Sequence, residues 1–170
     1  FVKPETILMD IKFKNMQQLT LLRDLALESE FISEDIKNHS IPATLTYKGD
    51  RYKATINLFG TWLDHVNSEK FSLQVRLNKG KTIRGMRKFS LLHPKVRQGV
   101  YEWLIHQLLK REKLIALRFS HVNVVLNGKN KGIYALEEGY TKQLVENNGL
   151  PEGLIVKFEE TIPNMKIYGE

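Results

Sequence analysis

The chain contains no cysteine among its 170 residues, which excludes disulfides and thiolate chemistry and leaves its compartment open. No apolar run approaches the roughly 20 residues that a membrane-spanning helix needs. The chain begins at Phe1, without a Met, a basic segment or the apolar stretch of a signal peptide. This start predicts that the chain was cut from a longer precursor.

Motifs of self-contained hydrolases and of common nucleotide-binding loops are also missing. The sequence has neither Gly-x-x-x-x-Gly-Lys-Ser/Thr nor Gly-x-Gly-x-x-Gly, and no serine lies in a nucleophile-elbow context. The five histidines lack the close pairing of a zinc-binding helix. His65 and His93 remain candidates for ligands or bases, although isolated histidines are more often structural or solvated.

The charge of the chain is unevenly distributed. Residues 70–118 carry 13 Lys and Arg but only two acids, so this segment is net +11 and the rest of the chain is net −4. A basic segment of this kind attracts phosphate on a nucleotide, a nucleic acid or a lipid head group. The alternative is a solvated basic face without a dedicated ligand. Nucleic acid is the less favoured partner, because no aromatic platform or helix-turn-helix pattern accompanies the charge.

Apolar periodicity predicts an α+β fold with a mostly antiparallel sheet and a packed helix. Strands are expected at 6–13, 43–47, 52–59, 71–77, 87–92, 121–126, 133–138 and 154–158, with hairpin turns at 48–51 and 127–132. Helices are expected at 16–28, at 94–112, and between Thr141 and Gly149. Residues 1–42 are interpreted as an N-terminal strand–helix extension, 43–160 as the main lobe, and 161–170 as a tail.

The order of these elements is that of the small lobe of a protein kinase: a strand pair, a helix with an acid, and a second strand pair ending in carboxylates. Such a lobe needs a cation for the nucleotide phosphates, a helix carboxylate to hold the cation, and a hinge for the base. Lys70 and Arg76 on the strand at 71–77 are candidate cations. Glu102 is the candidate helix carboxylate, and Glu137–Glu138 end the strand that leads to the hinge.

A purely structural role for the same residues, without any ligand, is an equally good interpretation. Glu102 is four residues before His106, so the two side chains can pair on one helix face without any ligand. Glu137 and Glu138 can likewise be a solvated strand end.

Several stretches in order resemble the CotH kinase family, the proteins similar to spore coat protein H. The most specific is Val-x-Val-x-Leu-Asn-Gly-x-x-x-Gly-Ile-Tyr-x-Leu-x-Glu, present from Val122 to Glu138. The other matching stretches are 56–60, 69–75, 85–89, His93-Pro94, Glu102 and 153–157. The resemblance covers roughly residues 43–158.

The resemblance implies an atypical kinase-like fold that binds ATP with Mg²⁺ or Mn²⁺ and phosphorylates protein serines. It makes Lys70, Arg76 or Lys88 the phosphate-contacting cation, Glu102 its helix partner, and Glu137 and Glu138 part of the hinge. The chain departs from the family pattern at His93, which stands where an acid is usual. The catalytic and metal-binding aspartates are expected in a second lobe beyond this chain, so this piece is not expected to act alone.

The leading interpretation is a lobe that contributes part of a nucleotide site, and two other interpretations compete with it. One is a noncatalytic kinase-like scaffold that binds an anionic envelope polymer or a coat protein through the basic face. The other is a domain whose basic surface only provides solubility or contact with anionic membrane. The family analogy also suggests a bacterial envelope or surface location.

Overall fold

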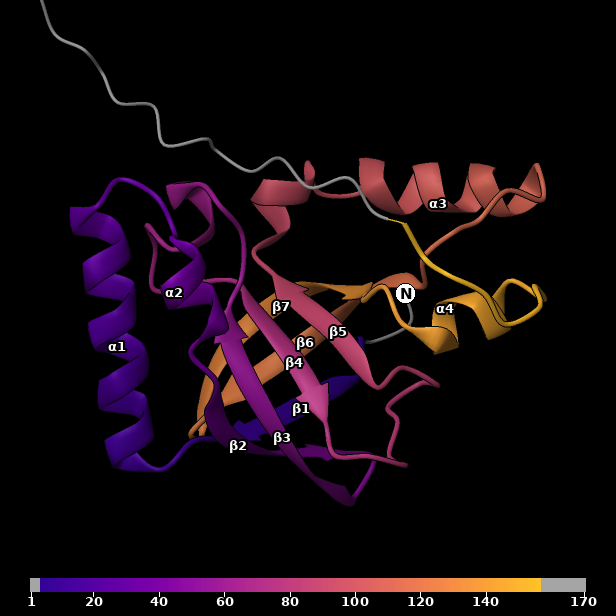
Figure 1. Cartoon of the computed structure of the whole chain (residues 1–170). Coiled ribbons are helices and arrows are strands. Elements are labelled where there is room, and N and C mark those ends of the chain that lie inside the picture. The colour runs from indigo at the N-terminus through magenta and orange to yellow at the C-terminus, as the bar shows by residue number, and fades with distance from the viewer. Residues whose placement is uncertain (1–3, 157–170) are drawn as a thin grey trace, which may run out of the picture.

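The computed structural model describes residues 4–156, which form a closed barrel of seven strands flanked by four α-helices (Figure 1). The strands are β1 (Thr6–Asp10), β2 (Ile41–Tyr47), β3 (Asp50–Leu58), β4 (Leu73–Leu77), β5 (Lys88–Leu92), β6 (Phe119–Leu126) and β7 (Lys129–Glu138). The helices are α1 (Phe13–Glu28), α2 (Glu34–Asn38), α3 (Tyr101–Arg111) and α4 (Lys142–Asn147), with 3-10 turns η1 (Leu63–His65) and η2 (Pro94–Arg97).

The α+β class is as expected, but the sheet is mixed and closed rather than a plain antiparallel sheet. Its strand order is β1-β2-β3-β4-β5-β7-β6, and every neighbouring pair is antiparallel except β1 and β6. In that parallel pair, Ile7 lies opposite Val124. The Asn127 side chain secures the closure, because its Oδ1 accepts a hydrogen bond from Ile11 N at 2.7 Å and its Nδ2 donates to Ile11 O at 3.0 Å. The strand of the N-terminal segment is therefore part of the barrel wall.

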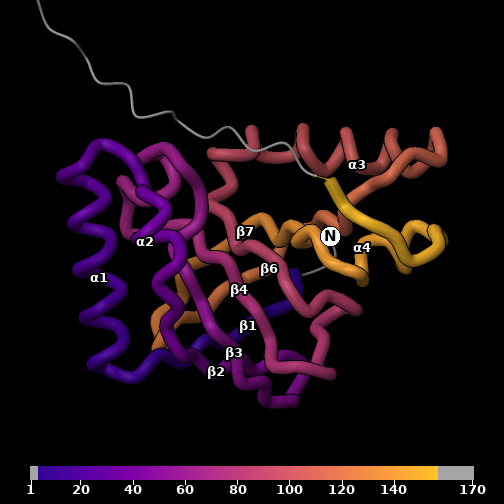
Figure 2. The backbone as a smooth tube through the Cα atoms, in the orientation of Figure 1, coloured from indigo at the N-terminus to yellow at the C-terminus, as the bar shows by residue number. Residues whose placement is uncertain are grey.

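Alternation along the strands fills the barrel with apolar side chains. On β4, Leu73, Val75 and Leu77 are buried while Arg76 is exposed, as the period-2 pattern of a half-buried strand predicts. Figures 1 and 2 both place α1 and α2 on one side of the barrel and α3 and α4 on the other. Among residues 4–156, no helix is both long enough and apolar enough to cross a bilayer.

The two expected hairpins are confirmed, with β2 paired to β3 and β6 paired to β7. The second turn is tighter than expected, because Asn127 and Gly128 alone connect the strands, both with positive φ (47° and 78°). Asn-Gly is favoured there because both positions of this turn need left-handed backbone.

Three other expectations were wrong in detail. The helix expected at 94–112 is interrupted, since Gln98 adopts a left-handed conformation (φ 48°) that ends η2 before α3 begins. Helix α2 was not among the expected elements; Ser33 caps its start, because Ser33 Oγ accepts a hydrogen bond from Ile36 N. Residues 154–156 of the expected last strand are irregular, whereas residues 157–158 and the expected tail at 161–170 lie outside the described residues.

Candidate functional site

Lys70 lies in the loop just before β4, not on the strand itself. Its Nζ donates to Ile133 O on β7 at 2.8 Å and lies 5.1 Å from the centre of the Tyr134 ring. Partial burial lowers the pKa of the Lys70 ammonium, and burial raises the pKa of Tyr134 far above its usual value. Within residues 4–156, no carboxylate forms an ion pair with Lys70. Among the described residues, a carbonyl dipole and a ring face therefore stabilise its positive charge.

His93 shares the electrostatic environment of Lys70. The pKa of the His93 imidazole is lowered by burial and also by the charges of Lys70 and Lys95. Its Nδ1 accepts a hydrogen bond from Lys95 N at 3.1 Å, which caps the start of η2. Burial and these neighbouring positive charges both disfavour the protonated form of the imidazole.

Glu137 is buried on β7, where it pairs with Arg97 of η2. Arg97 Nε donates to Oε2 at 2.9 Å and Nη2 donates to Oε1 at 3.3 Å, which is a two-pronged arrangement. Burial lowers the pKa of nearby His65, and the charge of Arg97 lowers it further, against an opposing effect of Asp64. Arg97 is the last residue of η2, which ends there because Gln98 adopts a left-handed conformation. Without this break, η2 would continue into α3 and Arg97 would lie inside a helix.

Glu138 is fully buried on β7 and is held by Arg118, which precedes β6. Its Oε2 accepts from Arg118 N at 2.9 Å and from Nε at 3.0 Å, and Arg118 Nη2 also pairs with Oε1. The same guanidinium donates to the carbonyls of Arg84, Gly85 and Gln143. Arg118 therefore joins the β4–β5 loop, the end of β7 and α4.

Both carboxylates at the end of β7 are thus buried and paired, so the interpretation of a solvated strand end is wrong. Their backbone is also engaged. Glu138 N donates to Arg118 O and Gly139 N donates to Lys88 O at 2.9 Å. A Cβ on Gly139 would lie 2.9 Å from Lys88 O, so only glycine fits this close approach of β5.

The remaining candidates lie elsewhere on the molecule. Arg76 and Lys88 face each other across β4 and β5 on the outer side of the barrel. Glu102 lies on α3, and its Oε1 is 3.6 Å from Nε2 of His106, the pair that the structural interpretation predicts. Lys70 and Glu102 form no ion pair with each other, since Lys70 contacts Ile133 and Glu102 contacts His106.

The structure therefore groups Lys70 with His93, and it pairs Glu137 and Glu138 with two arginines that sequence reasoning did not single out. A carboxylate that lies inside a strand and is buried needs a cation as a partner. This requirement was the one signal that could have pointed to Arg97 and Arg118. The sequence offers 26 Lys and Arg as possible partners, 13 of them in residues 70–118. Within residues 4–156, no three His, Asp or Glu side chains are arranged to hold a metal ion.

Comparison with known proteins identifies the family. No curated protein matches the chain. The chain does match the family model described as CotH kinase protein over residues 47–167, which is most of its length and includes every candidate site residue. The chain therefore belongs to the CotH kinase family.

Proposed function

We propose that this chain is the small-lobe portion of a CotH-family protein kinase and supplies cationic groups to an ATP site that uses Mg²⁺ or Mn²⁺. One observation carries the proposal: Lys70 is anchored by the Ile133 carbonyl but has no carboxylate partner among the described residues. An ammonium group that no carboxylate neutralises is suited to phosphate oxygens.

The surroundings of Lys70 support this role. Lys95 and Lys70 both lower the pKa of His93, which indicates a positive local potential that would attract a polyphosphate. Arg97 contributes less to that potential, because Glu137 already neutralises it. The residues around Lys70 therefore fit a triphosphate, whereas residues 4–156 offer the metal no group of three ligands.

In this proposal, Glu137 and Glu138 act on the nucleotide only indirectly. Their carboxylates are used by Arg97 and Arg118, so they fix the position of the segment that follows β7. Bound ATP with its metal would supply the phosphoryl group that is transferred to protein. The contribution of this chain is to bind and orient the phosphates and to offset their charge.

The test is calorimetric titration of ATP, with Mg²⁺ or Mn²⁺, into the protein at its full natural length. Replacing Lys70→Ala removes a charged hydrogen-bond donor and is expected to weaken binding by about tenfold or more. The matched control is Lys79→Ala, which removes an equal charge from an exposed turn and is expected to leave affinity within about twofold. Glu102→Ala, measured alongside, tests whether the helix carboxylate joins the site when ATP binds.

Circular dichroism of each variant establishes that it is folded. Binding that is equally strong in wild type and in a folded Lys70→Ala variant would remove Lys70 from the site. Absence of any ATP binding by the wild-type protein would refute the nucleotide function itself.

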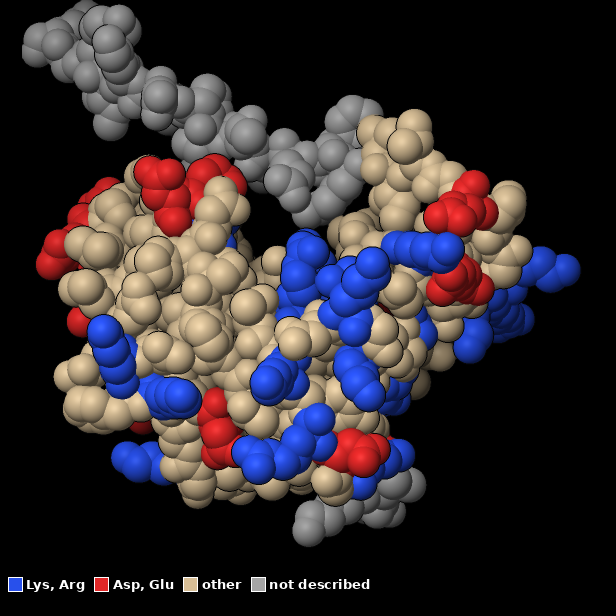
Figure 3. Space-filling model, turned by 60° about the horizontal axis from the view of Figure 1, so that its bottom comes forward, with Lys and Arg blue, Asp and Glu red and all other residues tan. Residues whose placement is uncertain are grey.

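A noncatalytic scaffold for an anionic polymer is the second candidate function, and the outer barrel surface favours it. Lys and Arg side chains gather over the middle of the face in Figure 3, with few acids among them. Arg76 and Lys88 are direct cross-strand neighbours, so two basic side chains lie side by side on this surface. This function predicts salt-dependent binding of polyphosphate that Arg76→Ala weakens and Lys70→Ala leaves unchanged.

A further inference from the structure

A cavity of about 650 Å³ lies among α3, residues 113–118 and α4, within the size range of small-molecule sites. The side of the barrel bounds it, through the β4–β5 loop, the start of β6 and the end of the neighbouring β7. Lys70, His93 and Arg97 do not line this cavity. It is therefore a different place from the ATP site proposed above.

The lining of the cavity is positively charged. Among the described residues, four cationic side chains and no Asp or Glu contribute to it; the cations are Arg84, Lys110, Lys113 and Arg118. Glu138 neutralises Arg118, and Arg84 lies 4.0 Å from a Glu5 oxygen. Lys110 and Lys113 form no ion pair within the described part of the chain, so two full charges remain for a ligand.

The rest of the lining mixes polar side chains, such as Gln107 and Asn147, with apolar ones. Met86, Leu114, Leu136 and Leu150 contribute to it from four different segments. These apolar side chains, beside the two ammonium groups, suit a ligand that has an apolar body and one anionic group.

Hydrogen bonds between the segments hold the cavity open in one arrangement. The Asn148 side chain accepts from Ala116 N at 2.9 Å and donates to Ala116 O at 3.1 Å, which ties the end of α4 to residues 113–118. His106 Nδ1 accepts from Leu117 N at 3.3 Å, and its ring stacks on Phe119 at 5.6 Å. A site whose walls are already fixed loses less entropy when a ligand binds.

We propose that this cavity binds a small organic phosphate, a phosphate monoester on an apolar or aromatic body. Lys110 and Lys113 pair with the phosphate, which carries close to two charges at neutral pH and so matches two unpaired ammonium groups better than a carboxylate does. The apolar body lies against the leucine side chains. The proposal does not depend on the nucleotide function of Lys70.

Phenyl phosphate is the probe, titrated into the full-length protein and followed by calorimetry and by amide chemical shifts. Binding in the millimolar range or tighter is expected, with the largest shifts at Ala116, Leu117 and Asn148. The double substitution Lys110→Gln and Lys113→Gln should weaken binding by about tenfold or more, because both phosphate partners lose their charge. Lys79→Gln is the matched control and should leave binding unchanged.

Three outcomes would overturn the proposal. They are no binding at roughly 10 mM phenyl phosphate, binding that survives the double substitution, and binding that Lys70→Ala abolishes. ATP serves as a competitor that separates the two sites. If ATP binds but leaves the phenyl phosphate affinity unchanged, both sites stand; if phenyl phosphate binds in a protein that binds no ATP, this cavity stands alone.

Discussion

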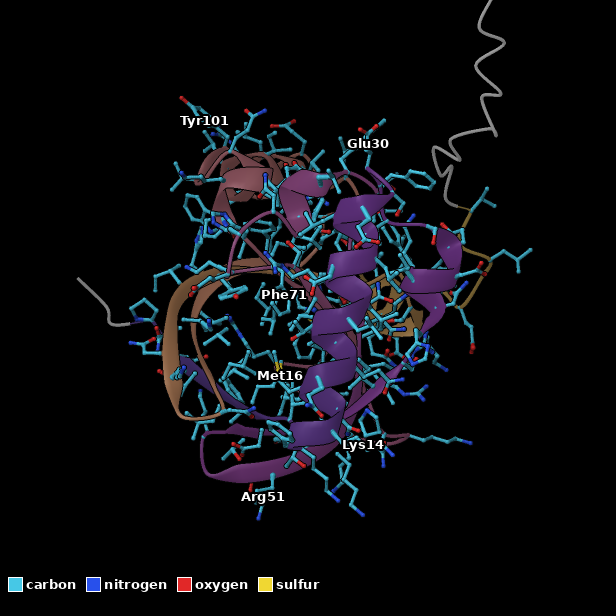
Figure 4. The ribbon with its side chains drawn as sticks, turned by 90° about the vertical axis from the view of Figure 1, so that its left-hand side faces the viewer. Lys14, Met16, Glu30, Arg51, Phe71 and Tyr101 are labelled. Carbon is cyan, nitrogen blue, oxygen red and sulfur yellow. The ribbon has the colours of Figure 1, made fainter. Side chains whose placement is uncertain are left out.

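Helices α1 and α3 differ in how they use their apolar side chains. On α1, Leu19 and Ala26 are completely buried against the barrel. On α3, only His106 is buried, while Leu104 and Leu108 are about half exposed (47% and 50%). Figure 4 looks onto α1, with Lys14 near its lower end and Glu30 just beyond its upper end, and shows Tyr101 of α3 at the far top of the molecule.

This difference shows that an apolar stripe does not by itself place a helix. The stripe of α3 was expected to pack, yet the helix contacts the barrel mainly through β6. Helix α1 also gains a polar tie to the barrel side, because Arg23 Nε donates to Val66 O at 2.8 Å. The α1 side is therefore a closely packed part of the core. The α3 side contains the cavity, which is lined by Lys110 and Lys113.

The largest effect is expected on the α3 side, from the buried pair that organises it. Glu138→Gln leaves the Arg118 guanidinium without its counter-charge and should lower the free energy of unfolding by about 4 kcal/mol. Urea denaturation measures this. Glu137→Gln is the matched control; Glu137 is slightly less buried than Glu138 and accepts two hydrogen bonds from Arg97 rather than three, so the loss should be smaller. Equal losses would show that Arg118 does not organise this side.

A smaller effect is expected from truncating one leucine on each helix. Leu19→Ala opens a cavity at a completely buried position and should cost about 3 kcal/mol of unfolding free energy. Leu108→Ala, at a half-exposed position, should cost less than about 1 kcal/mol. The same urea experiment measures both variants. A Leu108 variant as destabilised as the Leu19 variant would mean that α3 packs as tightly as α1 in solution.

The fold was predictable where the information is local and was missed where it is not. Hairpins follow from alternating strands and glycine-containing turns, and both were found. The parallel pairing of Ile7 with Val124 joins residues more than a hundred positions apart, and no local pattern specifies it. Closure of the barrel depends on that pairing, so an antiparallel sheet was the natural but incomplete expectation.

The candidate site divides in the same way. Glu137 and Glu138 stood out because they end a strand, but their partners Arg97 and Arg118 lie 40 and 20 residues away. The expected continuous helix at 94–112 also hid Arg97, because only the break at Gln98 sets its position beside β7. The pairing of Glu102 with His106 was visible in advance, since four-residue spacing on a helix is local.

The smallest effect is a pH dependence that belongs to the α1 side. Burial keeps the folded-state pKa of His65 below its usual value near 6.5, and its Nδ1 has no hydrogen-bond partner among residues 4–156. The unfolded chain therefore binds a proton more readily, so this contribution to stability is complete above pH 6.5 and declines as the pH falls toward the lower folded-state pKa. His65→Gln cannot titrate, and it should reduce the loss of unfolding free energy between pH 7.5 and pH 5.

Urea denaturation at those two pH values measures the difference for wild type and variant, with the denaturant slope checked for constancy. The comparison within each protein cancels any constant cost of losing the ring contact between His65 and Phe59. An unchanged pH dependence in the variant would mean that His65 is protonated as readily in the folded protein as in the unfolded chain. The loop around Val66, which Arg23 joins to α1, would then be open to water. The α1 side would be less closely packed than the burial of Leu19 indicates.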